Sequence, residues 1–181
     1  MHHSPILLET LRDAQRFGFF GERPIEDAVA HADHFVAATS HVVSGARLLD
    51  LGSGGGLPGL VVAEARRDLH VVLLDRRRKR TDFLERAVRR LDFDHVEVWA
   101  RDAVEVVRSI RTGGDEAFDV VTARGFGPPD LTLRTAVACC VPGGWIVISE
   151  PPTGDRWSAE RCAELGVTVD DRGPVIRFRR I

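Results

Sequence analysis

A run of glycines directly after an apolar segment constrains the fold of this chain more than any other feature. The apolar segment covers residues 47–51, and the turn after it reads Gly52-Ser53-Gly54-Gly55-Gly56. Glycine loses more conformational entropy on folding than any other residue. The five glycines between positions 52 and 59 therefore argue against a turn that binds no ligand. In an open α/β sheet, such a turn lies at the carboxyl end of a strand and lets backbone N–H groups approach a ligand. We therefore expect a ligand site at this turn.

Strand and helix patterns alternate along the rest of the chain. Short apolar strand patterns occupy residues 47–51, 70–75, 95–100, 118–123 and 144–149, and helical patterns separate them, the first from about residue 57 to residue 67. Asp102 can cap the helix that follows the third strand. This alternation predicts a parallel sheet with right-handed crossovers. Two further strand patterns, at residues 167–169 and 175–178, flank a turn-forming segment and predict an antiparallel hairpin.

The first 44 residues have a different pattern. Apolar residues recur at helical spacing from residue 4 to about residue 39, with a break at residues 18–24, which predicts two leading helices. We expect a single domain over residues 1–181, with a helical N-terminal cap (1–44) and a Rossmann-like core (45–181). The expected fold class is α/β, with a mostly parallel seven-stranded sheet, a C-terminal antiparallel hairpin and two N-terminal helices.

Composition excludes several classes of protein. Apolar residues make up 44% and charged residues 29%, which is the balance of a globular protein, and no apolar run is long enough to span a bilayer. The N-terminus lacks the pattern of a signal peptide, so we expect a cytoplasmic protein without a membrane partner. The net charge of -2 limits any RNA contact to a local patch. Cys139, Cys140 and Cys162 have no metal-ligand spacing, so we expect buried, reduced thiols and no metal site.

Two acids at later strand ends favour a nucleoside ligand. Asp75 ends the second strand about 20 residues after the glycine turn, where a carboxylate can accept hydrogen bonds from ribose hydroxyls. Asp102 follows the third strand and can accept from an adenine amino group. A dinucleotide enzyme is an alternative, because residues 54–59 also match the fingerprint G-x-G-x-x-G. Asp50, Pro58 and the terminal hairpin favour an S-adenosylmethionine-dependent methyltransferase instead.

Three segments resemble one family of methyltransferases. They are Leu48-Leu49-Asp50-Leu51-Gly52-Ser53-Gly54-Gly55-Gly56-Leu57-Pro58-Gly59-Leu60, then Leu74-Asp75 with Lys79-Arg80 and Phe83-Leu84-Glu85, and finally Asp119-Val120-Val121-Thr122-Ala123-Arg124-Gly125-Phe126 with Pro142-Gly143-Gly144. Together they are similar to the glucose-inhibited division protein B family, whose members are small-subunit ribosomal RNA guanine-N7 methyltransferases. The similarity runs from about residue 47 to residue 148, and its most specific parts are Leu57-Pro58-Gly59 and Ala123-Arg124.

The resemblance implies an S-adenosylmethionine cofactor, an RNA substrate and the residues that contact them. Gly52 and Leu57 are implied to line the cofactor, and Asp102 and Ala103 to meet its adenine. Arg124 is implied to border methionine and substrate, as the candidate catalytic residue. Taken with the turn and the acids, the expected cofactor-binding residues are Asp50, Gly52, Ser53, Gly54, Gly56, Leu57, Asp75, Arg76, Asp102, Ala103 and Arg124.

Methyl transfer to guanine N7 of ribosomal RNA, the expected reaction, explains why no acid–base constellation stands out. The N7 lone pair is already a nucleophile and has no proton to lose, so the protein contributes mainly by positioning the reactants. Arg124 is expected to hold the methionine carboxylate or the guanine edge, since its planar fork suits either. The alternative for Arg124 is a surface salt bridge.

The chain departs from the family pattern on the substrate side. Arg101-Asp102-Ala103 stands where the family has an Arg, a small residue and a Glu, and Glu150 stands where it has a Lys. The N-terminal region is shorter and has His31-Ala32-Asp33 in place of an Asn-Leu-Thr segment. Two alternatives therefore stay open. One is a methyltransferase for a small molecule or another RNA, and the other is a non-catalytic RNA-binding or cofactor-sensing relative.

Further residues have both a functional and a structural interpretation. The run Arg76-Arg77-Arg78-Lys79-Arg80 is either a phosphate contact or a solvated helix start. Packing or surface roles, rather than metal binding, are expected for His31, His34 and His41. Among the aromatic residues, Trp99 and Trp145 are expected in the core, and Phe126 is the candidate for stacking on a base.

Overall fold

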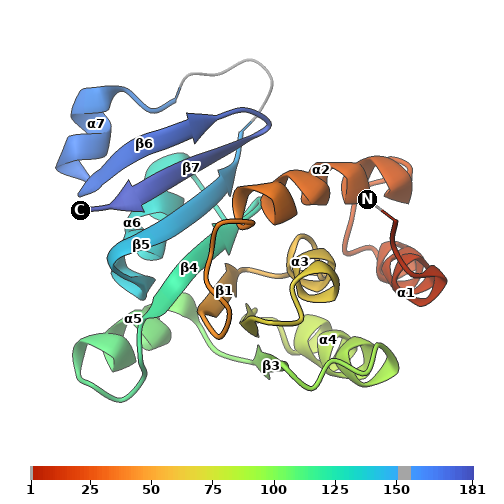
Figure 1. The fold of residues 1–181 in the computed structure, drawn as a ribbon. Helices are drawn as coiled ribbons and strands as arrows, with labels where there is room; N and C mark the ends of the chain where they lie inside the picture. The colour runs from red at the N-terminus through yellow and green to blue at the C-terminus, as the bar shows by residue number, and fades with distance from the viewer. Residues whose placement is uncertain (1, 151–155) are drawn as a thin grey trace.

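The computed structural model describes residues 2–150 and 156–181, which form an α/β fold around one twisted sheet (Figure 1). The sheet holds seven strands in the order β3-β2-β1-β4-β5-β7-β6. They are β1 (Arg47–Leu51), β2 (His70–Leu74), β3 (Val96–Trp99), β4 (Phe118–Ala123), β5 (Cys140–Ser149), β6 (Val167–Arg172) and β7 (Val175–Arg180). The first five strands pair in parallel, and β7 runs antiparallel to both β5 and β6. The predicted parallel sheet with a C-terminal hairpin is confirmed.

Helices cover both faces of the sheet. They are α1 (Pro5–Arg16), α2 (Ile25–Ala38), α3 (Gly59–Ala65), α4 (Arg78–Arg90), α5 (Ala103–Arg111), α6 (Pro129–Cys139) and α7 (Ala159–Glu164). Helices α1 to α4 pack into one apolar core, and α5 to α7 pack into a second core on the opposite face (Figure 1). The two predicted leading helices are confirmed as α1 and α2. Among the described residues, no helix is long and apolar enough to cross a membrane.

The central strands feed side chains into both cores. On β1, Leu48 belongs to the core under α1 to α4, and Leu49 belongs to the core under α5 to α7. Successive side chains of a strand point to opposite faces, so a strand covered on both sides must be apolar at consecutive positions. This requirement explains the continuous apolar runs from which the strands are predicted.

Two element boundaries differ from expectation. Helix α3 starts at Gly59 rather than near residue 57, because the turn continues through Pro58 and the Gly59 N–H donates to Asp50 Oδ2 (3.2 Å). Strand β5 starts at Cys140 rather than at residue 144, because Cys140 already pairs with Phe118 before the pairing becomes irregular.

The three cysteines are buried free thiols, as expected. Burial raises the pKa of Cys139 and Cys140 to about 12. Both thiols therefore stay protonated at neutral pH and act as small apolar side chains of the second core.

Candidate functional site

The glycine turn lies at the carboxyl ends of the central strands. The N–H groups of Gly52 and Ser53 both donate to Leu74 O at the end of β2 (2.9 Å each). Gly52 has a φ of +78°, and a Cβ placed there would lie 2.8 Å from the Phe126 ring. This conformation and this close approach both require glycine.

Asp50 is buried beneath the turn and fixes its shape. Its carboxylate accepts hydrogen bonds from the Gly59 N–H (3.2 Å) and Thr122 Oγ1 (2.9 Å), and its backbone oxygen accepts from Ser53 Oγ (2.9 Å). Burial raises the pKa of Asp50 to about 6, against the opposing effects of these hydrogen bonds and of the Arg124 charge. Asp50 and Ser53 therefore lie below the turn and tie it to α3 and β4.

Asp75, the acid after β2, already has donors from its own chain on both carboxylate oxygens. Oδ1 accepts from the Arg77 N–H (2.8 Å), and Oδ2 accepts from the Gly54 N–H (3.0 Å) and the Arg80 guanidinium (3.2 Å). A carboxylate has about four acceptor positions. Asp75 thus clamps the glycine turn to the start of α4 and keeps about one acceptor position for a further donor.

A cavity of about 640 Å³, here called the α5–α6 cavity, opens beside Asp75. Five of the expected cofactor-binding residues line it, namely Gly52, Asp75, Arg76, Asp102 and Ala103. Asp102 caps α5 as expected, since its Oδ1 accepts from the Val104 N–H (2.9 Å). Val107 and Leu131 supply apolar walls from α5 and α6. The size and the mixed lining are those of a small-ligand pocket.

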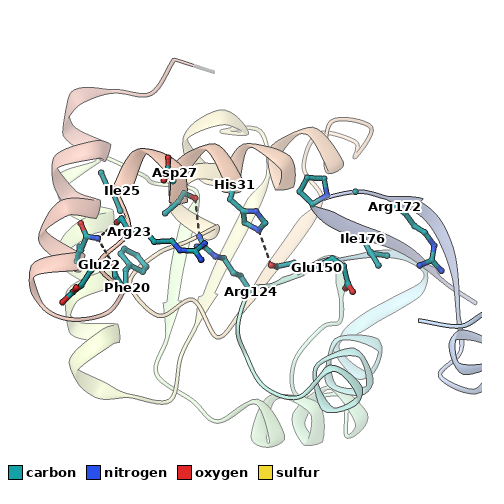
Figure 2. A pocket seen from close by; sticks show the side chains of 16 residues that line it. Phe20, Glu22, Arg23, Ile25, Asp27, His31, Arg124, Glu150, Arg172 and Ile176 are labelled. Atoms are coloured by element: carbon teal, nitrogen blue, oxygen red, sulfur yellow. Dashed lines mark hydrogen bonds between the residues drawn. The ribbon is translucent and has the colours of Figure 1, made fainter. Parts of the chain in front are cut away.

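A second cavity of about 1090 Å³, here called the α2 cavity, adjoins Arg124 (Figure 2). The end of α1, the following loop, α2, the end of β5 and the β6–β7 turn all contribute to its walls. Figure 2 shows Arg124 reaching toward α2, where its guanidinium donates to Ala28 O (3.4 Å). His31 Nε2 lies 3.2 Å from Ser149 Oγ across the same cavity. Burial, and after it the Arg124 charge, lower the pKa of His31, which favours the neutral ring.

Phe126 lines the α5–α6 cavity beside the glycine turn. Arg124 lines the α2 cavity, whereas Gly125 and Phe126 line the α5–α6 cavity, and among the described residues the two cavities share no lining residue. The Phe126 ring packs on the second core and against Gly52. The loop after β4 therefore contributes to both cavities.

The structure brings together only part of the expected site. Gly54, Gly56 and Leu57 belong to the turn but line neither cavity, and Arg124 faces a different cavity from Asp102. Lining residues without a signal in the sequence are Val107, Leu131, Arg134 and Thr135 in one cavity and Gln15, Arg172 and Ile176 in the other. These residues lie on helices and a hairpin. The hydrophobic pattern of such an element predicts which face packs on the sheet, but not which residues line a cavity.

Glu150 borders the α2 cavity with its carboxylate already engaged. It accepts from Arg156 Nε and Nη2 (3.0 Å each) and from Trp157 Nε1 (3.1 Å). The Glu150 side chain is 6% exposed, and Trp157 is fully buried. The acid that stands in place of the family Lys therefore has a structural role in joining the end of β5 to the segment before α7.

The histidines and tryptophans named above have packing partners. His31 lies beside His34, with ring centroids 6.0 Å apart, and His41 lies edge-on to Trp145 at 4.4 Å. Among the described residues, no group of three or more His, Cys, Asp or Glu side chains is placed to hold a metal. Trp99 and Trp145 are only partly buried, so their expected place in the core is wrong in part. Each ring packs on a core and also makes a cation–π contact, Trp99 with the Arg101 guanidinium and Trp145 with the Arg179 guanidinium.

The strand order, the antiparallel β7 and the glycine turn after β1 define the Rossmann-like fold of S-adenosylmethionine-dependent methyltransferases. A putative O-methyltransferase from Klebsiella pneumoniae shares this fold, with a TM-score of 0.69 at 16% identity over 100% of this chain and 91% of that chain. The family model for rRNA small subunit methyltransferase G (GidB) matches residues 11–149. The chain belongs to this family, as the resemblance predicts.

Curated relatives carry the same family name. Ribosomal RNA small subunit methyltransferase G of Salinispora arenicola is 39% identical over 135 residues, which are 74% of this chain and 55% of the relative. Its counterpart in Salinispora tropica is 38% identical over 145 residues, which are 79% of this chain and 58% of the relative. The chain thus spans little more than half the length of these relatives.

Proposed function

We propose that this chain is an S-adenosylmethionine-dependent methyltransferase that methylates N7 of a guanine in small-subunit ribosomal RNA. The family match over residues 11–149 carries the proposal, because it includes the glycine turn, Asp102 and Arg124. The names of the relatives support the same reaction. The proposal gives the protein RNA as its partner and the cytoplasm as its compartment.

The residues at the α5–α6 cavity fit the nucleoside half of the cofactor. Asp102 and Ala103 would hold adenine, and Asp75 and Arg76 lie where the ribose would be held. Gly52 lines the same cavity, so the backbone of the turn can approach the ligand there. The remaining expected residues of the turn, Asp50, Ser53, Gly54, Gly56 and Leu57, would act by holding its shape. Bound S-adenosylmethionine would supply an electrophilic methyl group on its sulfonium.

Arg124 and the α2 cavity would hold the acceptor. Burial lowers the pKa of Arg124, and the Asp50 charge opposes this effect, but a guanidinium stays charged at neutral pH. Arg124 can therefore donate to the methionine carboxylate or to the guanine edge. No base is required for an N7 acceptor, so the chain contributes by positioning, which reaches roughly 7–11 kcal/mol in favourable model systems.

Glu150 favours a second candidate, a methyltransferase for a small molecule or another RNA. Its carboxylate pairs with Arg156 and stands at the wall of the α2 cavity, where the resemblance implies a Lys. The wall therefore lacks a cation that would favour a phosphate backbone.

The test is incubation of the protein with labelled S-adenosylmethionine and total RNA from a strain that lacks the gene. We expect label in small-subunit RNA, and mapping of the label to guanine N7. Label in other RNA or in the small-molecule fraction would support the second candidate. A protein that binds the cofactor and transfers no label would be a non-catalytic relative.

A further inference from the structure

The α5–α6 cavity is surrounded by more positive charge than the cofactor explains. Its lining includes two aspartates, Asp75 and Asp102, and six arginines, Arg76, Arg77, Arg80, Arg101, Arg111 and Arg134. Among the described residues, the lining of the α2 cavity is balanced, with Arg23, Arg124 and Arg172 against Glu22, Asp27 and Glu150. The difference is notable in a chain whose net charge is -2.

Ion pairs account for half of these arginines. Arg80 pairs with Asp75 (3.2 Å), Arg101 with Asp115 (2.7 Å) and Arg76 with Asp102 (3.7 Å). Across the described residues, the structure pairs no carboxylate with the other three, which are Arg77, Arg111 and Arg134. We call these three the arginine rim.

The arginine rim draws on three elements that are distant in sequence. Arg77 precedes α4, Arg111 ends α5 and Arg134 lies in α6, and all three are exposed. Tertiary packing therefore places three exposed arginines on the lining of one cavity, where their charges favour the binding of an anion.

S-adenosylmethionine is not that anion. Its adenine and ribose are neutral, its sulfonium is a cation, and its single carboxylate lies at the methionine end, which the proposed function directs toward Arg124. An RNA backbone has the complementary chemistry, because it presents a regular series of phosphates that arginine forks bind in a bidentate manner.

We propose that the arginine rim binds the phosphodiester backbone of the RNA substrate as it crosses the opening of the α5–α6 cavity. The inference rests on the proposed function, since it takes RNA as the substrate. Val104 and Leu131, which are 66% and 53% exposed, line the same cavity and offer apolar contact to sugars or bases. Phosphate contacts of this kind set the position of the RNA and do not read its sequence.

The experiment compares two triple variants that remove the same charge. The rim variant carries Arg77→Gln, Arg111→Gln and Arg134→Gln. The control variant carries Arg86→Gln, Arg89→Gln and Arg108→Gln, at exposed positions on α4 and α5 that line neither cavity. Binding of a small-subunit ribosomal RNA transcript is measured from 50 to 300 mM salt. S-adenosylhomocysteine affinity and the thermal midpoint are measured on the same samples.

We expect the rim variant to lower the slope of log Kd against log salt by about 2–3, because each lost phosphate contact contributes about 0.7–0.9. The control variant should keep the wild-type slope, the wild-type affinity for S-adenosylhomocysteine and the wild-type thermal midpoint. Equal slopes for the two variants would overturn the proposal while leaving RNA methylation by the wild type intact. A wild type without RNA affinity would overturn both the rim and the proposed function.

Free nucleotides provide the remaining arm of the experiment. If the rim variant lost affinity for ATP or inorganic phosphate but bound the transcript as the control variant does, the rim would be a small-anion site. That result would also overturn the proposal.

Discussion

Asp50 combines burial, three hydrogen-bonded neighbours and a nearby guanidinium within a single side-chain environment. Its exposure is 1%, and its folded-state pKa of about 6 lies above the ordinary value of 3.8. Between these two values the folded chain binds more protons at Asp50 than the unfolded chain does. Its contribution to stability is therefore fully present below about pH 4 and is lost as pH rises through about 6.

The variant Asp50→Asn tests this linkage, because an amide does not titrate. From pH 4 to pH 7 we expect the free energy of unfolding of the wild type to fall relative to that of the variant by about 2 kcal/mol. Urea unfolding of both proteins at the two pH values measures the difference, and other titrating groups cancel in it. An identical pH dependence for the two proteins would show that Asp50 has an ordinary pKa.

The charge of Arg124 is expected to contribute to activity. A hydrogen bond to a charged group contributes about 1.5–3 kcal/mol, so Arg124→Ala should lower kcat/KM by about 10- to 100-fold. Arg86→Ala serves as the control, since Arg86 is exposed on α4 and lines neither cavity. Unchanged cofactor affinity and turnover in the Arg124 variant would leave this residue with only a surface role.

At the scale of elements, the order of strands and helices follows from the sequence, because each buried strand must be apolar on both faces. The clustering of Gly52, Asp75 and Asp102 follows as well, since all three stand at carboxyl ends of parallel strands. The separation of Arg124 from Asp102 does not follow, because it depends on how the Phe126 ring packs. The places of Arg134 and Arg172 in the cavity walls do not follow from the sequence either. They depend on the tilt of α6 and on the position of the hairpin.

The contacts of Glu150 at the junction between β5 and α7 are expected to stabilise the fold. Glu150→Lys restores the residue that the family resemblance implies, but it removes the acceptor of the buried Trp157 N–H and places a cation beside Arg156. We expect a loss of about 2–4 kcal/mol, seen as a fall in Tm of roughly 5–15 °C. Glu160→Lys, at an exposed position on α7, should leave Tm nearly unchanged. Equal Tm values for the two variants would contradict the structural role of Glu150.

At the scale of the whole molecule, two cavities and two charge environments meet at the carboxyl edge of one sheet. The α5–α6 cavity combines a nucleoside-sized space with a positive opening, and the α2 cavity is larger and balanced in charge. The proposed reaction requires S-adenosylmethionine, so cofactor binding is the first property of the chain to test.

Thermal unfolding with and without S-adenosylhomocysteine measures whether the folded chain binds the cofactor product. A ligand that binds only the folded state at 100 times its Kd stabilises it by about 2.7 kcal/mol, or roughly 5–10 °C for a chain of this size. We expect this shift with S-adenosylhomocysteine and no shift with NAD at the same concentration. A shift with NAD alone, or with neither ligand, would contradict the assignment of this site to S-adenosylmethionine.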